Sequence, residues 1–128
     1  MATKQSTADR NTLNGAAIFT WEALGNADDG APVAIPFAAD MTVQVTGTFG
    51  GATCVIEGSN DGSNWRTLHS ERVASGGGSN SVSLSFTSTG LDKVYETPVY
   101  VRPKTSGGTG TDLDVTLVAR ALYSKVGY

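Results

Sequence analysis

Apolar and polar residues alternate along much of the chain, and the pattern is clearest in residues 41–49. There the odd positions are apolar, apart from Gly47, and the even positions carry threonine or glutamine. Because successive side chains of a β-strand point to opposite faces, this period of two is typical of a half-buried strand. The apolar face of the segment comprises Met41, Val43, Val45 and Phe49.

Similar short segments recur along the chain, separated by clusters of glycine, asparagine, aspartate and serine. Regular spacing of this kind is typical of a sandwich or a barrel. We therefore predict an all-β fold, a single antiparallel β-sandwich of about eight short strands. Helix content should be very low, with at most one helical turn near residues 91–95. The predicted strands are residues 16–21, 32–38, 41–49, 52–58, 64–73, 81–86, 99–104 and 113–122.

Two turns between these segments make specific predictions about pairing. Gly50-Gly51 predicts a hairpin in which residues 41–49 pair with residues 52–58. Asp61-Gly62 is a preferred pair for a tight turn. The aromatic residue that follows, Trp65, would open the next strand and cover the end of the core.

The ends of the chain differ from its middle, and we divide the chain accordingly. Residues 1–15 are polar and without periodicity, which predicts an extended N-terminal arm. Such an arm offers little apolar surface to its own domain, so we expect a neighbouring chain to hold it. Residues 16–122 would form the β-sandwich domain, and residues 123–128 a C-terminal tail.

Composition and charge exclude several classes of partner. The 128 residues suit one domain, and only 16% are charged, so much of the polar surface must come from uncharged residues. The net charge is −3 and the nine Lys and Arg residues are scattered, which argues against a nucleic-acid partner. No apolar stretch is long enough to span a membrane. Residues 1–15 also lack the apolar core of a signal peptide, so we expect synthesis in the cytoplasm of a host cell.

Candidate catalytic residues are few. His69 is the chain's one histidine, and its neighbour Ser70 should point to the opposite face of the strand. Cys54 is the one cysteine and lies among apolar residues, where a buried structural thiol is the common finding. We therefore expect neither an enzyme nor a cofactor.

Metal and phosphate sites are equally weakly indicated, and we predict no metal ion. Calcium sites need several oxygen ligands at defined spacing, and the acidic clusters here are too sparse. The glycine-rich loop at residues 76–78 lies between predicted strands, whereas a phosphate loop opens a helix. The clusters considered as metal ligands are Asp28-Asp29, the group Asn60, Asp61 and Asn64, and the pair Asp112 and Asp114.

Two longer segments resemble the sequences of a known class of proteins. They are "VTGTFGGATCVIEGSNDGSNWRTL" and "TGLDKVYETPVYVRPKTSGGTGTDLDVTLVAR". Together they resemble small β-sandwich structural proteins of tailed bacteriophages, over about residues 42–120. Cys54, where valine is usual in that pattern, and the loop at 76–78 depart from it. The "SNDGSNW" element is also similar to one in discoidin-like sugar-binding domains.

The first resemblance implies a virion component, most simply a capsid decoration or cement protein on the head surface. Its partners would be the major capsid protein, further copies of itself as a dimer or trimer, or both. A position in the neck or tail of the particle is an alternative. The contacts we expect lie at the polar ends of the chain: Thr3, Lys4, Arg10, Asn11, Tyr123, Lys125 and Tyr128.

A second hypothesis is a carbohydrate-binding module built around Trp65. Lectin-like β-sandwiches offer an exposed aromatic ring beside Asn or Asp hydrogen-bonding groups, and "GSNDGSNW" carries both. The alternative interpretation of the same stretch is structural, with Asp61 and Gly62 forming the turn and Trp65 capping the core.

Overall fold

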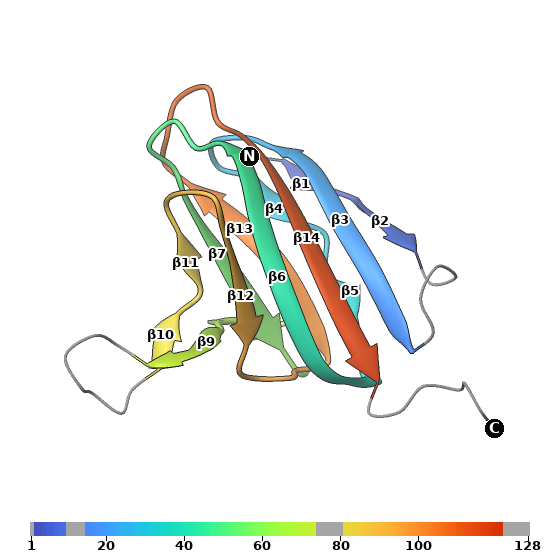
Figure 1. Ribbon diagram of the computed structural model, residues 1–128. Coiled ribbons are helices and arrows are strands. Elements are labelled where there is room, and N and C mark those ends of the chain that lie inside the picture. Colours follow the sequence, from blue (N-terminus) through green and yellow to red (C-terminus); the bar gives the residue numbers. More distant parts are fainter. Residues whose placement is uncertain (1, 10–14, 74–80, 122–128) are drawn as a thin grey trace.

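The computed structural model describes residues 2–9, 15–73 and 81–121, and within these residues it is all-β with no helix. Two sheets, largely antiparallel, pack face to face as the sequence predicted (Figure 1). The helical turn expected near residues 91–95 is wrong. This segment is strand β12 (Gly90–Val94), which pairs with β6 (Ala38–Thr48). Its alternation fits a strand, because Val94 faces the core and Leu91 and Lys93 face solvent.

The first sheet has β13 (Tyr100–Ser106) and β7 (Thr53–Ser59) at its centre. Every pairing in it is antiparallel except that of β1 (Thr3–Lys4) with β4 (Asp29–Gly30). Two short strands join it from the side, β5 (Val33–Ala34) beside β13 and β8 (Arg66–Thr67) beside β7. The order of the sheet is β1 (Thr3–Lys4), β4 (Asp29–Gly30), β13 (Tyr100–Ser106), β7 (Thr53–Ser59) and β11 (Ser85–Phe86).

The second sheet contains the longest strands, and its centre is the antiparallel trio β6, β14 and β3. These strands alternate between buried and more exposed positions, as the sequence pattern predicted. The order of the sheet is β10 (Ser81–Ser83), β9 (His69–Val73), β12, β6 (Ala38–Thr48), β14 (Asp112–Ala121), β3 (Ala16–Leu24) and β2 (Ser6–Asp9).

The core fills the space between the sheets with aliphatic side chains, Met41, Cys54, two phenylalanines and one tryptophan. Trp21 is 1% exposed, and its indole Nε1–H donates to the carbonyl oxygen of Ala31 at 2.9 Å. Cys54 is fully buried, as predicted, and loss of hydration raises the pKa of its thiol to about 12. A thiol in this environment serves as a small apolar core residue.

The predicted hairpin at Gly50-Gly51 is wrong, because β6 and β7 belong to different sheets. The chain instead crosses from one sheet to the other at the two glycines, and the loop between β13 and β14 makes the same crossing beside it (Figure 1). The loops are joined by a backbone hydrogen bond from Thr109 N–H to the Gly50 carbonyl at 2.9 Å. Alternation predicts which face of a strand is buried, but it does not predict in which of the two sheets the strand lies.

The crossing at Gly50 leaves no room for a side chain. Its φ is 61°, in the left-handed region that favours glycine, and a Cβ built there would lie 2.0 Å from the Thr109 carbonyl oxygen. Gly51 also has a positive φ, of 89°, but a Cβ there would meet nothing within 4 Å.

The N-terminal segment forms two short strands over residues 2–9, where the sequence predicted an extended arm. Strand β1 pairs with β4 in the first sheet, and β2 pairs with β3 in the second. Threonine and serine suit strands, and the edges of β3 and β4 supply unpaired backbone groups that the segment satisfies.

The other expected contacts at the chain ends cannot be placed. Arg10, Asn11, Tyr123, Lys125 and Tyr128 lie outside the described residues.

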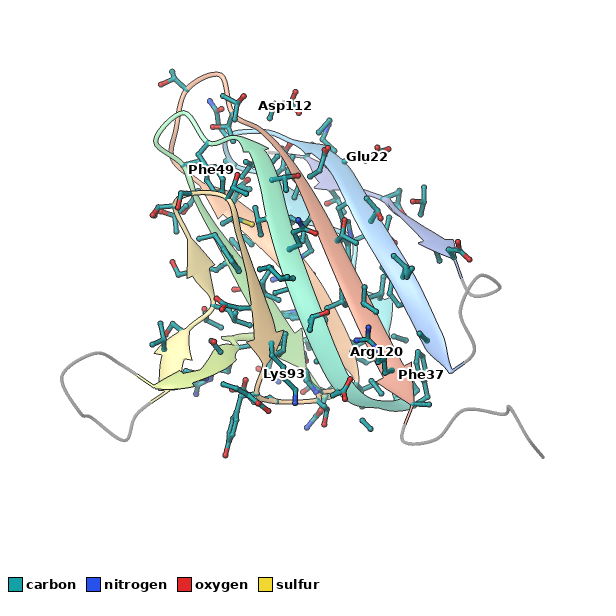
Figure 2. The ribbon with its side chains drawn as sticks, viewed as in Figure 1. Glu22, Phe37, Phe49, Lys93, Asp112 and Arg120 are labelled. Carbon is teal, nitrogen blue, oxygen red and sulfur yellow. The ribbon has the colours of Figure 1, made fainter. Side chains whose placement is uncertain are left out.

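In the described part, Figure 2 shows Phe37 beside Arg120 at the end of β14, and Phe49 near Asp112 at the opposite end. No helix in that part of the chain is long and apolar enough to cross a membrane.

Candidate functional site

An open groove of about 990 Å³ lies where β7 and β8 end and β9 begins. It is lined by residues 57–60 and 64–69, by Ser83, and by residues 96–98. The stretch that most resembles a binding site in the sequence, residues 58–68, therefore forms most of one wall. The segment before β13 forms another part of the wall, from far along the chain.

The turn at Asp61 is built around its carboxylate. One oxygen, Oδ1, accepts hydrogen bonds from Ser63 N–H at 2.8 Å, Asn64 N–H at 2.9 Å and the Ser59 hydroxyl at 2.9 Å. The other, Oδ2, accepts from the Asn64 amide Nδ2 at 2.7 Å. These bonds, the Asn64 N–H first, lower the pKa of Asp61, since each favours the ionised carboxylate.

The predicted turn at Asp61-Gly62 is present, with Gly62 at φ 77°. β7 and β8 pair antiparallel on either side of it, Glu57 opposite Thr67. The connection is longer than a two-residue hairpin, and the Asp61 side chain holds it together.

Trp65 is half-buried and does not belong to the set of buried side chains that forms the core. The tryptophan inside the core is Trp21. The expected role of Trp65 as a core cap is thus replaced by a different contact, in which the guanidinium of Arg102 lies 4.1 Å from the centre of its ring. Arg102 Nε–H in turn donates to Glu57 Oε1 at 3.0 Å. The carboxylate therefore holds the guanidinium in place against the indole ring.

His69 and Glu96 form a second polar pair in the groove. Glu96 Oε2 lies 2.7 Å from His69 Nδ1, and Glu96 Oε1 accepts from the His69 backbone N–H at 2.8 Å. In a neutral imidazole the nitrogen beside a carboxylate carries the proton, which leaves Nε2 as an acceptor. The side chain of His69 is 42% exposed, whereas Ser70 is buried, so the two point apart as predicted.

Sequence reasoning missed the contributions of Glu96 and Arg102. Strand pairing brings Glu96 to the groove and Arg102 to the Trp65 ring behind it: Arg102 lies opposite Glu57 across β13 and β7, and Glu96 follows β12, which pairs with β9 at Ser70. A carboxylate 27 residues from its histidine has no recognisable spacing. Only the order of strands in the sheets could have placed these groups together.

The floor of the groove depends on Gly58. A Cβ at this position would lie 2.5 Å from Pro98 Cγ and 2.6 Å from Leu68 Cδ2. Leu68 is buried, so the glycine allows the segment at Pro98 to pack closely over β7. This close approach gives the groove its second wall.

In the remaining acidic clusters, Asp28 and Asp114 accept hydrogen bonds from backbone groups of the chain. Asp28 accepts from Gly25 N–H at 2.7 Å and Ala2 N–H at 3.0 Å, and these bonds, that to Gly25 first, lower its pKa. Asp114 Oδ1 accepts from Ala23 N–H at 3.1 Å. Within residues 2–9, 15–73 and 81–121 no group of three or more His, Cys, Asp or Glu side chains could hold a metal ion. The loop at 76–78 lies outside the described residues.

No protein-family model, curated protein or solved structure matches the chain.

Proposed function

We propose that the chain is a structural protein of a tailed-phage virion, a capsid decoration or cement protein that binds the major capsid protein. It forms a sandwich of about eight principal strands and attaches by the side that its N-terminal strands form. The support comes from the resemblance of residues 42–120 and from the way residues 2–9 are built into the fold.

The observation that carries the proposal is the position of β1 and β2. β1 ends the order of one sheet and β2 ends the order of the other, so a single short segment supplies the outermost strand of both sheets on one side of the sandwich. Both strands lie beside β3 (Figure 1). A neighbouring chain that approaches this side meets two strand edges at once.

The chemistry of this side suits assembly onto a shell. Thr3, Gln5 and Thr7 are exposed and polar, so the surface tolerates water before assembly. An exposed strand edge can add a strand from a partner through backbone hydrogen bonds, and flanking side chains then supply specificity. Thr3 and Lys4, two of the contacts expected from the sequence, lie on this side.

The test is co-sedimentation of the purified protein with heads assembled from the major capsid protein of the same genome. We expect binding that saturates at a fixed ratio to the capsid subunit. Thr3→Lys combined with Thr7→Lys should weaken binding by about tenfold or more, because charged lysines on strand edges oppose strand addition.

Gln44→Lys is the matched control, since Gln44 is an exposed position in the middle of β6. It should bind as the unaltered protein does. Absence of binding to heads would contradict the decoration role, and binding to isolated necks or tails would move the protein to that part of the particle. An equal loss of binding by Gln44→Lys would show that the added positive charge, and not the strand edge, is what weakens binding to heads.

A further inference from the structure

We infer that the groove beside Trp65 is a binding site for a neutral oligosaccharide. The inference is independent of attachment to a capsid, which uses the side of the sandwich formed by β1 and β2. It rests on a fixed aromatic ring, on a set of oriented hydrogen-bonding groups, and on the balance of charges along the groove.

The aromatic ring is held in place before any ligand arrives. Arg102 covers one face of the Trp65 indole at 4.1 Å and is itself fixed by Glu57. Both members of this ion pair are mostly buried, with side chains 19% and 14% exposed. Trp65 lines the groove and Arg102 does not, so the part of the ring that Arg102 leaves uncovered borders the groove. A rigid ring binds with little loss of conformational entropy.

The polar groups around the ring are fixed by bonds that leave one function of each free to face a ligand. Asn60 Oδ1 accepts from Val99 N–H at 3.1 Å, so its amide NH₂ is the remaining donor. Asn64 donates through Nδ2 to Asp61, so its Oδ1 is the remaining acceptor. His69 turns Nδ1 toward Glu96, which leaves Nε2. The groove thus offers one donor and two acceptors in addition to the ring, and sugar hydroxyl groups can pair with both kinds.

The charges of the groove favour a neutral ligand. The carboxylate of Glu57 is paired with Arg102, and the other two charged side chains of the lining, Glu96 and Arg66, have opposite signs. The lining therefore has no excess of either charge that would select a cation or an anion. Sugar rings have apolar C–H faces that stack on an indole and hydroxyl edges that exchange hydrogen bonds, which matches the two kinds of surface in the groove.

The experiment is a binding titration of the full chain with neutral hexaoses of glucose, mannose, galactose and N-acetylglucosamine, followed by tryptophan fluorescence and calorimetry. Trp21 is buried in the core, so a change in fluorescence reports on Trp65. We expect saturable binding to at least one of these oligosaccharides. Trp65→Ala should weaken it by about tenfold, and Trp65→Phe should retain most of it.

Two further variants make the test specific. Asn60→Asp keeps the acceptor for Val99 N–H but replaces the donor NH₂, and it should weaken binding by about threefold or more. Phe37→Ala removes an exposed aromatic ring that does not line the groove and should leave binding unchanged. Circular dichroism of each variant verifies that it is folded.

Three results would overturn the inference. They are absence of binding at millimolar concentrations of every hexaose, equal affinity of folded Trp65→Ala, and binding confined to uronic-acid oligosaccharides included as a parallel series. The last would assign recognition to the exposed Arg66 rather than to stacking.

Discussion

The two ends of strand β7 are built in different ways. At its beginning, the chain arrives from the other sheet through Gly50 and Gly51, and the loop is fixed mainly by backbone groups: Ala52 N–H donates to Phe49 O at 2.9 Å, and Thr109 N–H to Gly50 O at 2.9 Å. One side chain adds to these bonds, because the Thr111 hydroxyl donates to Phe49 O at 2.8 Å. At its far end, the chain turns at Asp61 and is fixed by side chains.

The difference separates a structural end from the end at which we infer binding. Backbone bonding between two glycine loops is satisfied internally and exposes little chemistry to a ligand. Side-chain interactions at the groove end orient Asn60, Asn64 and Trp65. We therefore expect substitutions at the first end to affect stability, and substitutions at the second to affect binding as well.

The largest effect should come from Gly50→Ala. The new Cβ would lie 2.0 Å from the Thr109 carbonyl oxygen, and the positive φ adds strain. We expect a loss of about 3 kcal/mol in the free energy of unfolding, measured by urea denaturation.

Gly51→Ala is the matched control at the same crossing. It has a positive φ but open space around the Cβ, so it should cost only about 1 kcal/mol. Equal losses for the two variants would show that backbone strain alone, and not the contact between the loops, determines the structural end.

A smaller loss is expected at the groove end from Arg102→Met. This change keeps an apolar chain against Trp65 but leaves the mostly buried carboxylate of Glu57 without its cation. We expect a loss of about 2 kcal/mol, and Glu57→Gln in the same chain should recover about half of it. A double variant no more stable than Arg102→Met would contradict the proposed coupling.

The smallest effect should be the acid response of the exposed turn. Its bonds hold the pKa of Asp61 below the ordinary aspartate value of about 3.9. The turn's contribution is therefore complete above that value and is lost as the pH falls below it toward the lowered pKa of the folded state. Asp61→Asn should lower the urea midpoint slightly at pH 7 and flatten its decline in acid, and an unchanged acid slope would contradict the role of the carboxylate.

The sequence predicts the all-β class and the buried faces because alternation reports burial directly. Val43, Val45 and Leu117 are buried as their pattern requires. The sequence cannot predict strand partners equally well. The glycines at 50–51 are compatible with a hairpin or with a crossing between sheets, and only the packing of the whole core decides between them.

The same limit applies to the groove. The Asp61-Gly62 turn is local, so its residues are sufficient to predict it. The pairs Glu57–Arg102 and His69–Glu96 join residues that meet only through strand order. The N-terminal strands were missed because residues 2–9 bury little apolar surface, and their attachment depends on the backbone edges of β3 and β4.

Attachment by the side that β1 and β2 form is tested most directly by a cryo-electron microscopy map of heads bearing the purified protein. We predict density for the sandwich on the outer shell, with β1 and β2 against the capsid protein or a second copy and the groove at Trp65 facing outward. A map in which the groove end contacts the shell, or in which β1 and β2 face solvent, would contradict it.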